Sequence, residues 1–236
     1  MWSNEISIDK RYDREIEYIL GKLQMMKDLS FATEESKDRV WIYLASACER
    51  QDAVEEELEN IMETVILTFL KTRFFVERLS LVKMTYAECV LVCSLVHFDK
   101  DFERTVVRKV FSNALDYNLD GIFNFRLKAL KDEWQELSEV SARLLASASS
   151  DSDVFEVVSF IAGGEGGGNV LVVGDVAKNL TQHKNIDVPC VFDESEFNLL
   201  CALIEEKPAE IVIETNNLSR EVVSSLKRIS RVIEKQ

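Results

Sequence analysis

Proline and glycine are scarce in this sequence, which limits the places where a helix must end. The 236 residues include eight glycines and two prolines, and both prolines, Pro189 and Pro208, fall in the last third. No proline therefore interrupts a helix in the first two thirds of the chain. With 47% hydrophobic and 30% charged residues, the composition is that of a globular protein and not of a disordered chain.

Long apolar runs and an excess of positive charge are also missing. The longest strongly apolar stretch, Cys89 to Val96, is far shorter than the roughly 20 residues of a membrane-spanning helix, and the first residues lack a basic-then-apolar signal pattern. The 42 acidic residues outnumber the 28 basic ones, so the formal net charge is −14. Such a surface repels phosphate backbones and anionic lipid. The sequence therefore predicts a soluble, cytoplasmic protein with no membrane span, and it argues against a nucleic-acid partner.

Cysteine is infrequent and odd in number. The five cysteines lie on segments with helix-like or strand-like patterns, so we expect reduced, mostly buried thiols instead of a disulfide framework. They are Cys48, Cys89, Cys93, Cys190 and Cys201.

Apolar residues recur at helical spacing through most of the first 148 residues. The segment Thr85–Glu88 has the pattern of a capping box, and the segment after it is apolar on nearly every side, as central helices are. The spacing predicts helices over residues 11–26, 33–48, 54–70 and 99–117, and two more that begin near residues 85 and 123.

The pattern changes after residue 148. A short helix from Asp153 leads to the glycine-rich linker Gly163–Gly168, and the β-branched runs Val170–Val173 and Ile211–Ile213 have the pattern of buried strands. Two further helices are expected, over 193–204 and from Ser219, and Pro189–Phe192 is a candidate extra strand. We therefore expect an α+β protein, with a predominantly helical N-terminal bundle over residues 1–148 and a small α/β unit over 149–236.

The sequence contains one arrangement that resembles a metal site. Cys89, Cys93 and His97 are spaced at i, i+4 and i+8, which places two thiols and an imidazole along one side of a helix. That helix is apolar throughout, and no second cysteine pair completes four ligands. The sequence therefore predicts core packing for these three side chains, with no metal and no cofactor.

Nucleotide-binding and catalytic patterns are not found. The glycines of Gly163–Gly168 precede a strand, whereas phosphate-binding glycines follow one. The two histidines, His97 and His183, have no nucleophile in a recognisable setting, and the Glu-x-x-His pattern of di-metal bundles is absent. We therefore predict no catalytic residues.

The start of the helix near residue 123 carries two aromatic residues and two cations in about one turn. Such a face would stack against rings and bind anions, although the commoner arrangement is an amphipathic helix whose Arg126 pairs with a nearby acid. The candidate interaction face consists of Asn124, Arg126, Lys128 and Lys131.

This same stretch, Gly121-Ile-Phe-Asn-Phe-Arg-Leu-Lys128, resembles the sporulation-associated YtxC family of Firmicutes, and the likeness covers residues 118–232. The segment Gly163–Gly168 departs from the family, whose connection there is more acidic and polar. The resemblance implies a role in sporulation and no assigned enzymatic activity. Further matching segments follow in order: the helix through Leu137, Asp153–Ile161, Asn169–Val173, Phe197–Ile204, Lys207-Pro208 and Glu210–Ile213.

Taken together, these observations favour a non-enzymatic interaction or regulatory protein with an unidentified protein partner or with a second copy of itself. The alternative is an enzyme or small-ligand-binding protein with a site where the helical and α/β regions meet. Its pocket would be lined by Asp175, Asn216 and Asn217. Nucleic-acid binding through Arg126, Lys128 and Lys131 is a third hypothesis, which would need a continuous basic face.

Overall fold

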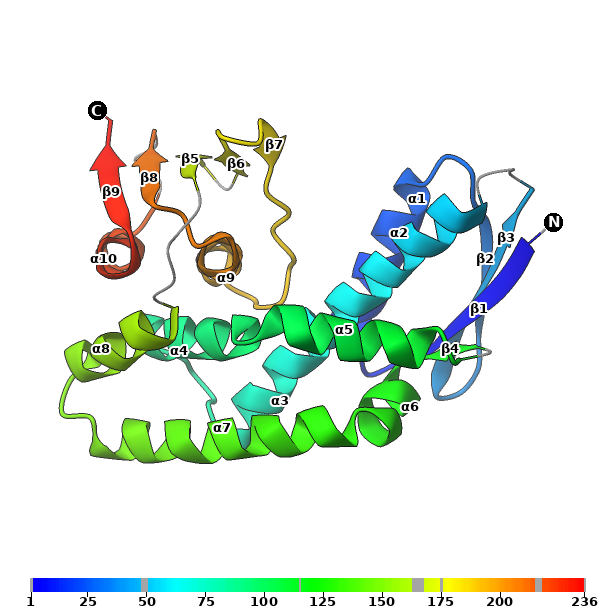
Figure 1. The fold of residues 1–236 in the computed structure, drawn as a ribbon, viewed down its shortest axis with the longest axis horizontal. Helices are drawn as coiled ribbons and strands as arrows, with labels where there is room; N and C mark the ends of the chain where they lie inside the picture. Colours follow the sequence, from blue (N-terminus) through cyan, green and yellow to red (C-terminus); the bar gives the residue numbers. More distant parts are fainter. Residues whose placement is uncertain are drawn as a thin grey trace. The chain divides into compact units, whose positions relative to one another are not determined.

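The computed structural model describes residues 2–47, 51–114, 116–162, 168–174, 176–214 and 218–235, the side chains at 157 and 159–162 excepted. The chain divides into two compact units, and each contains a small sheet with helices (Figure 1). Unit 1 comprises Met1–Lys71 and Asp99–Trp134, and unit 2 comprises Thr72–Phe98 and Gln135–Gln236. The α+β class is confirmed. The units interleave along the chain and do not divide near residue 148.

Unit 1 contains a four-stranded sheet in the order β2-β3-β1-β4. β3 (Arg39–Ser46) pairs antiparallel with both β2 (Ser30–Glu35) and β1 (Trp2–Asp9), and β1 pairs parallel with β4 (Tyr117–Asn118). The helix expected over residues 33–48 is therefore wrong. In β3, burial alternates with a period of two, as in a strand with one face on a core.

The helices of unit 1 agree better with the sequence pattern. The expected helix over 11–26 is α1 (Asp13–Met25), and that over 54–70 is α2 (Gln51–Thr64) with the π-helical segment η1 (Val65–Leu70). The helix expected over 99–117 is the shorter α5 (Lys100–Phe111). The chain then forms α6 (Leu119–Gly121), the π-helical segment η2 (Ile122–Arg126) and α7 (Lys128–Ser147), whose last residues belong to unit 2.

Unit 2 is built around α4 (Tyr86–His97). The expected capping box is present at Thr85, and the helix is buried on every side from Cys89 onward. α9 (Ser195–Glu206) and α8 (Asp151–Ala162) make its most extensive contacts. The remaining helices of the unit are α10 (Arg220–Ile229), capped by Ser219 as expected, and α3 (Lys71–Arg78), which begins with the last residue of unit 1.

A five-stranded sheet in the order β7-β6-β5-β8-β9 completes unit 2. β5 (Asn169–Val173) and β8 (Glu210–Ile213) are the two predicted strands, and they pair parallel with each other. The sequence did not indicate β6 (Val176–Asn179), β7 (Lys184–Asn185) or β9 (Arg231–Glu234). The candidate strand Pro189–Phe192 is wrong, because this segment runs in irregular structure.

α9 and α10 lie on one face of this sheet, and none of the other described helices of unit 2 lies on the opposite face (Figure 1). No helix in the described parts of the chain combines the length and the apolar character of a membrane span.

Candidate functional site

The two faces of the unit 2 sheet differ in what covers them. Val170 and Val172 of β5 are in register with Ile211 and Ile213 of β8, and these four side chains are at most 2% exposed, which assigns them to the face that the helices cover. The alternate residues lie on the other face. They include Val173 of β5 and three residues in register with one another across β5, β8 and β9: Leu171, Val212 and Ile233.

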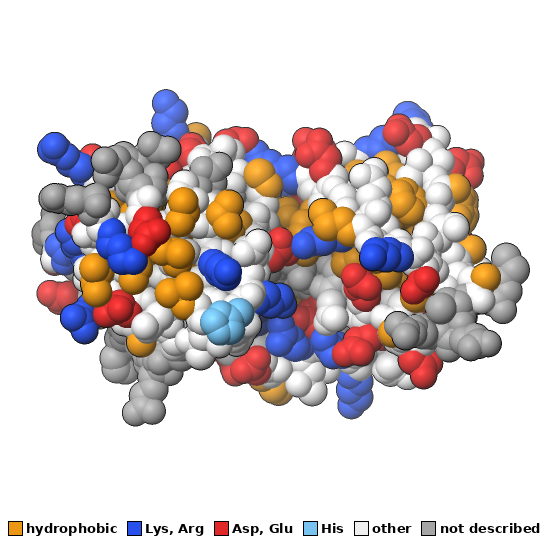
Figure 2. Space-filling model, turned by 90° about the horizontal axis from the view of Figure 1, so that it is seen from above, with side chains coloured by type: hydrophobic (Ala, Val, Ile, Leu, Met, Phe, Trp, Pro, Cys, Tyr) orange, Lys and Arg blue, Asp and Glu red, His pale blue; other side chains and the backbone are white. Residues whose placement is uncertain are grey.

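This uncovered face is apolar across its middle. Val173 pairs with Val176 of β6, and these two side chains are 48% and 56% exposed. Figure 2 shows the resulting gathering of hydrophobic side chains over this sheet. We call the set Leu171, Val173, Val176, Val212 and Ile233 the sheet patch.

The charges beside the sheet patch are largely paired within the unit. Arg231 Nη1 lies 3.4 Å from Glu210 Oε2, and Lys235 Nζ lies 2.5 Å from Glu214 Oε1. Lys178 is on the same face, opposite Leu171 in the β5–β6 pairing. The patch is therefore bordered by nearly balanced charge, although the chain as a whole carries −14.

The interaction face expected near residue 123 forms only in part. Lys131 Nζ donates a hydrogen bond to Asn124 Oδ1 over 3.1 Å and lies 4.8 Å from the centre of the Phe123 ring. Arg126 and Lys128 are exposed, and no ion pair is seen for either of them among the described residues. Asn124 and Lys131 thus hydrogen-bond to each other instead of presenting an open binding surface.

The ligand loops of the alternative hypothesis lie outside the described residues. Asp175, Asn216 and Asn217 belong to this group. The structure therefore provides no geometry for that pocket.

The helix face that carries Cys89, Cys93 and His97 packs against α9, which contributes Cys201 and Glu205. Cys201 Sγ lies 3.4 Å from His97 Nε2, and His97 Nδ1 lies 3.9 Å from Glu205 Oε2. Within the part of the chain that the structure describes, no group of three Cys, His, Asp or Glu side chains is arranged to hold a metal. The predicted core packing of these residues is confirmed by their burial.

The thiols of this cluster have shifted pKa values. A hydrogen bond from Cys93, together with His97, lowers the pKa of Cys201 to about 5, against the effect of burial. Burial and the neighbouring thiols raise the pKa of Cys93. Proton donors around Cys201 therefore favour its thiolate, and Cys93 keeps its proton. Sequence reasoning did not link Cys201 to these residues, because Cys201 lies 104 residues from His97 along the chain.

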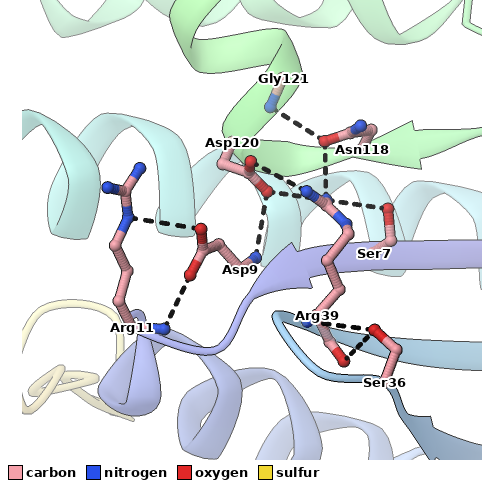
Figure 3. Close-up of polar contacts among 8 residues, drawn as sticks. All are labelled: Ser7, Asp9, Arg11, Ser36, Arg39, Asn118, Asp120 and Gly121. Carbon is pink, nitrogen blue, oxygen red and sulfur yellow. Dashed lines mark hydrogen bonds and ion pairs between the residues drawn. The ribbon is translucent and has the colours of Figure 1, made fainter.

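A second polar cluster lies in unit 1, where Arg39 of β3 joins three segments of the chain (Figure 3). Its Nη1 and Nη2 donate to the two carboxylate oxygens of Asp120 over 3.1 and 2.8 Å. Nη2 also donates to Asn118 Oδ1 and Ser7 Oγ. Asp120 in turn accepts a hydrogen bond from the backbone N–H of Asp9. Because the guanidinium is engaged by protein groups, this cluster fixes α6 and β4 to the sheet and is structural.

Gly121 is required by the same cluster. A Cβ at this position would lie 2.7 Å from Asn118 Oδ1, which Arg39 and the Gly121 N–H hold in place. We expect Gly121→Ala to lower the free energy of unfolding by about 1–2 kcal/mol, since the neighbouring groups must shift. Urea unfolding of this variant tests the prediction, and a loss below the error of the measurement would contradict it.

Comparison with known proteins gives no relative: neither a family model, nor a curated protein, nor a solved structure matches the chain.

Proposed function

We propose that this is a non-enzymatic interaction protein whose sheet patch binds the same patch on a second copy of the chain. The observation that supports the proposal is the apolar face of the unit 2 sheet, on which none of the described helices of that unit packs. Sheets bury apolar faces against one another at a separation of about 10 Å. Val173 and Val176 are exposed, Leu171 and Ile233 are half-buried, and Val212 between them is 9% exposed. Apolar surface that no helix of its own unit covers is often an interaction site.

The charges around the sheet patch favour a second copy of the chain as its binding partner. Two chains of net charge −14 repel each other over most of their surface. The sheet patch is an exception, because Glu210 and Glu214, the described acids that border it on β8, are paired with Arg231 and Lys235. Identical patches related by a two-fold axis match each other without further adaptation.

The size of the patch sets the expected affinity. Five strands about 4.8 Å apart, with about four residues each, make a face of roughly 300 Å². This is well below the roughly 800 Å² per partner of stable complexes. We therefore expect a reversible dimer with a Kd in the micromolar range.

We further propose that this association serves sporulation, in line with the resemblance of residues 118–232 to the YtxC family. The motif that carries the resemblance, Phe123–Lys128, lies in unit 1, so the proposal does not assign it to the dimer contact. Deletion of the gene in the source organism tests this part: reduced spore yield supports it, and unchanged sporulation contradicts it.

A lysine on the sheet patch is expected to weaken the dimer. In Val176→Lys, dimerisation would bury an ammonium group that has no counter-charge in the interface. We expect the Kd of the dimer to rise at least about tenfold. The matched control is Val140→Lys on α7, because Val140 is 57% exposed and Val176 is 56% exposed. Both substitutions reduce the net negative charge equally, so general repulsion cannot explain a difference between them.

Sedimentation equilibrium of the two variants and the wild type measures the three Kd values. The proposal predicts that only Val176→Lys weakens association. A wild type that stays monomeric, or a dimer weakened equally by both substitutions, would contradict it.

A further inference from the structure

The thiol cluster of unit 2 brings together groups from two helices that are far apart in sequence. α4 supplies Cys93 and His97, and α9 supplies Cys201 and Glu205. Cys201 is 3% exposed and His97 is 6% exposed, while the Glu205 side chain is 36% exposed. The cluster is thus buried at its thiol end and reaches solvent at its carboxylate end.

Each member of the cluster has a distinct relation to the Cys201 sulfur. His97 contacts it through Nε2 at 3.4 Å, and Cys93, one turn before His97 on α4, lies close enough to lower its pKa. Glu205 lies on the far side of the imidazole, 3.9 Å from Nδ1, where a carboxylate stabilises the protonated ring. Cys89 contacts Cys93 and not Cys201 among the described hydrogen bonds, and its sulfur lies 3.9 Å from that of Cys93. Among the described residues, Cys93 and His97 of α4 and Glu205 of α9 act on the pKa of Cys201, and Cys89 acts on that of Cys93.

The arrangement matches the requirements of thiol oxidation better than those of a purely apolar core. An oxidisable cysteine needs thiolate character, a proton donor for the leaving group and a second thiol within reach. Cys201, His97 and Cys93 meet these three requirements in that order. Cys190, in contrast, is exposed and is contacted at 3.7 Å by the Asn198 amide.

We propose that Cys201 is a peroxide-oxidised cysteine and that Cys93 resolves it, which joins α4 to α9 by a disulfide. Hydrogen peroxide is the oxidant class that fits, because it is uncharged and close to water in size, and it reaches buried groups through small local openings.

The reaction balances in two steps. The Cys201 thiolate attacks one peroxide oxygen, the S–O bond forms as the O–O bond breaks, and the departing hydroxide takes the His97 proton to become water. Cys201 is now a sulfenic acid. The Cys93 sulfur then attacks the Cys201 sulfur and gives up its proton, the S–O bond breaks, and a second water leaves. Two thiols have lost two electrons in total, and one peroxide has gained them.

The pH dependence of the first step distinguishes Cys201 from an ordinary free cysteine. A free cysteine has a pKa near 8.5, so its oxidation rate rises about tenfold per pH unit from pH 6 to pH 8. The Cys201 thiol has a pKa of about 5 and is already ionised in this range. We expect its rate to change by no more than about twofold between pH 6 and pH 8, with a small free thiol as the reference.

The test uses the full chain with Cys48 and Cys190 replaced by serine, which leaves the cluster intact. It is treated with equimolar hydrogen peroxide and examined by intact mass and peptide mapping. We expect the loss of two hydrogen atoms and a cross-linked peptide pair that contains Cys93 and Cys201. In a further Cys93→Ser variant, Cys201 should accumulate as a sulfenic acid that a dimedone reagent captures.

Three results would overturn the proposal. The first is a chain that stays reduced in peroxide while the reference thiol is consumed. The second is a disulfide that joins Cys89 to Cys93 and leaves Cys201 free. The third is a Cys201 rate that rises tenfold per pH unit like that of the reference. Each of these three results is read from a chain in which Cys93, His97 and Cys201 are unchanged. None of them therefore requires a substitution at the buried Cys201 that could prevent folding.

Discussion

Replacing Lys71 by methionine is expected to lower the free energy of unfolding of unit 1 by about 3–5 kcal/mol. Lys71 is fully buried, and its Nζ lies 2.6 Å from both carboxylate oxygens of Glu103. Burial lowers the pKa of Lys71 to about 8 and raises that of Glu103, which shows the cost of keeping both groups charged there. In the variant, Glu103 would retain the Trp134 indole N–H as a donor but would lose the lysine that balances its charge.

The double variant Lys71→Met/Glu103→Gln separates charge from packing. The glutamine oxygen still accepts the Trp134 hydrogen bond and carries no charge. We therefore expect the double variant to regain at least about 2 kcal/mol of the free energy of unfolding that Lys71→Met loses. The matched control is Lys10→Met, because Lys10, also in unit 1, makes an ion pair of nearly the same length, 2.7 Å, with Glu35 at an exposed site. It should cost less than about 1 kcal/mol.

Tryptophan fluorescence in urea reports this loss without interference from unit 2. All three tryptophans, Trp2, Trp41 and Trp134, belong to unit 1. If Lys71→Met costs no more than Lys10→Met, or if the added Glu103→Gln recovers nothing, the assignment of Lys71–Glu103 as a charged buried pair is wrong.

The second large effect is expected at Arg39. Arg39→Met removes four hydrogen bonds to Asp120, Asn118 and Ser7 and leaves the Asp120 carboxylate, which is 13% exposed, without its counter-charge. We expect a loss of about 2–3 kcal/mol, again measured by tryptophan fluorescence in urea.

Two variants serve as controls for Arg39. Arg39→Lys keeps the charge but cannot form the forked pair with Asp120. We therefore expect it to lower the free energy of unfolding by at least about half as much as Arg39→Met does. Arg11→Met acts on the neighbouring arginine in Figure 3, which is 64% exposed and lies 3.7 Å from Asp9, and should cost less than about 1 kcal/mol. Equal losses for Arg39→Met and Arg11→Met would show that the Arg39 network contributes little.

The sequence predicted most of the helices because burial repeats along them at a regular period. The exception, residues 33–48, shows why such a period can mislead. Val40, Trp41 and Leu44 are spaced as on a helix face, but Ile42 and Tyr43 complete a strand alternation, and the pairing of β3 with β1 and β2 decides between the two. That pairing is a tertiary interaction and is not encoded locally.

The same limit applies to the candidate sites. The spacing of Cys89, Cys93 and His97 correctly placed them on one helix face, but their partner Cys201 comes from α9 and was not predicted. The sheet patch was missed because β6 and β9, which contribute Val176 and Ile233, are short strands without a clear pattern of their own. Long-range contacts, and not local propensity, create both sites.

The most direct test of the proposed self-association is lysine cross-linking in a mixture of isotope-labelled and unlabelled chains, at a concentration well above the expected Kd. Mixed-isotope products identify links between two copies. The account predicts that these links involve Lys178 and Lys235, which lie on or beside the sheet patch. Links between copies that involve only lysines elsewhere, such as Lys109 and Lys128 of unit 1, or no such links at all, would contradict it.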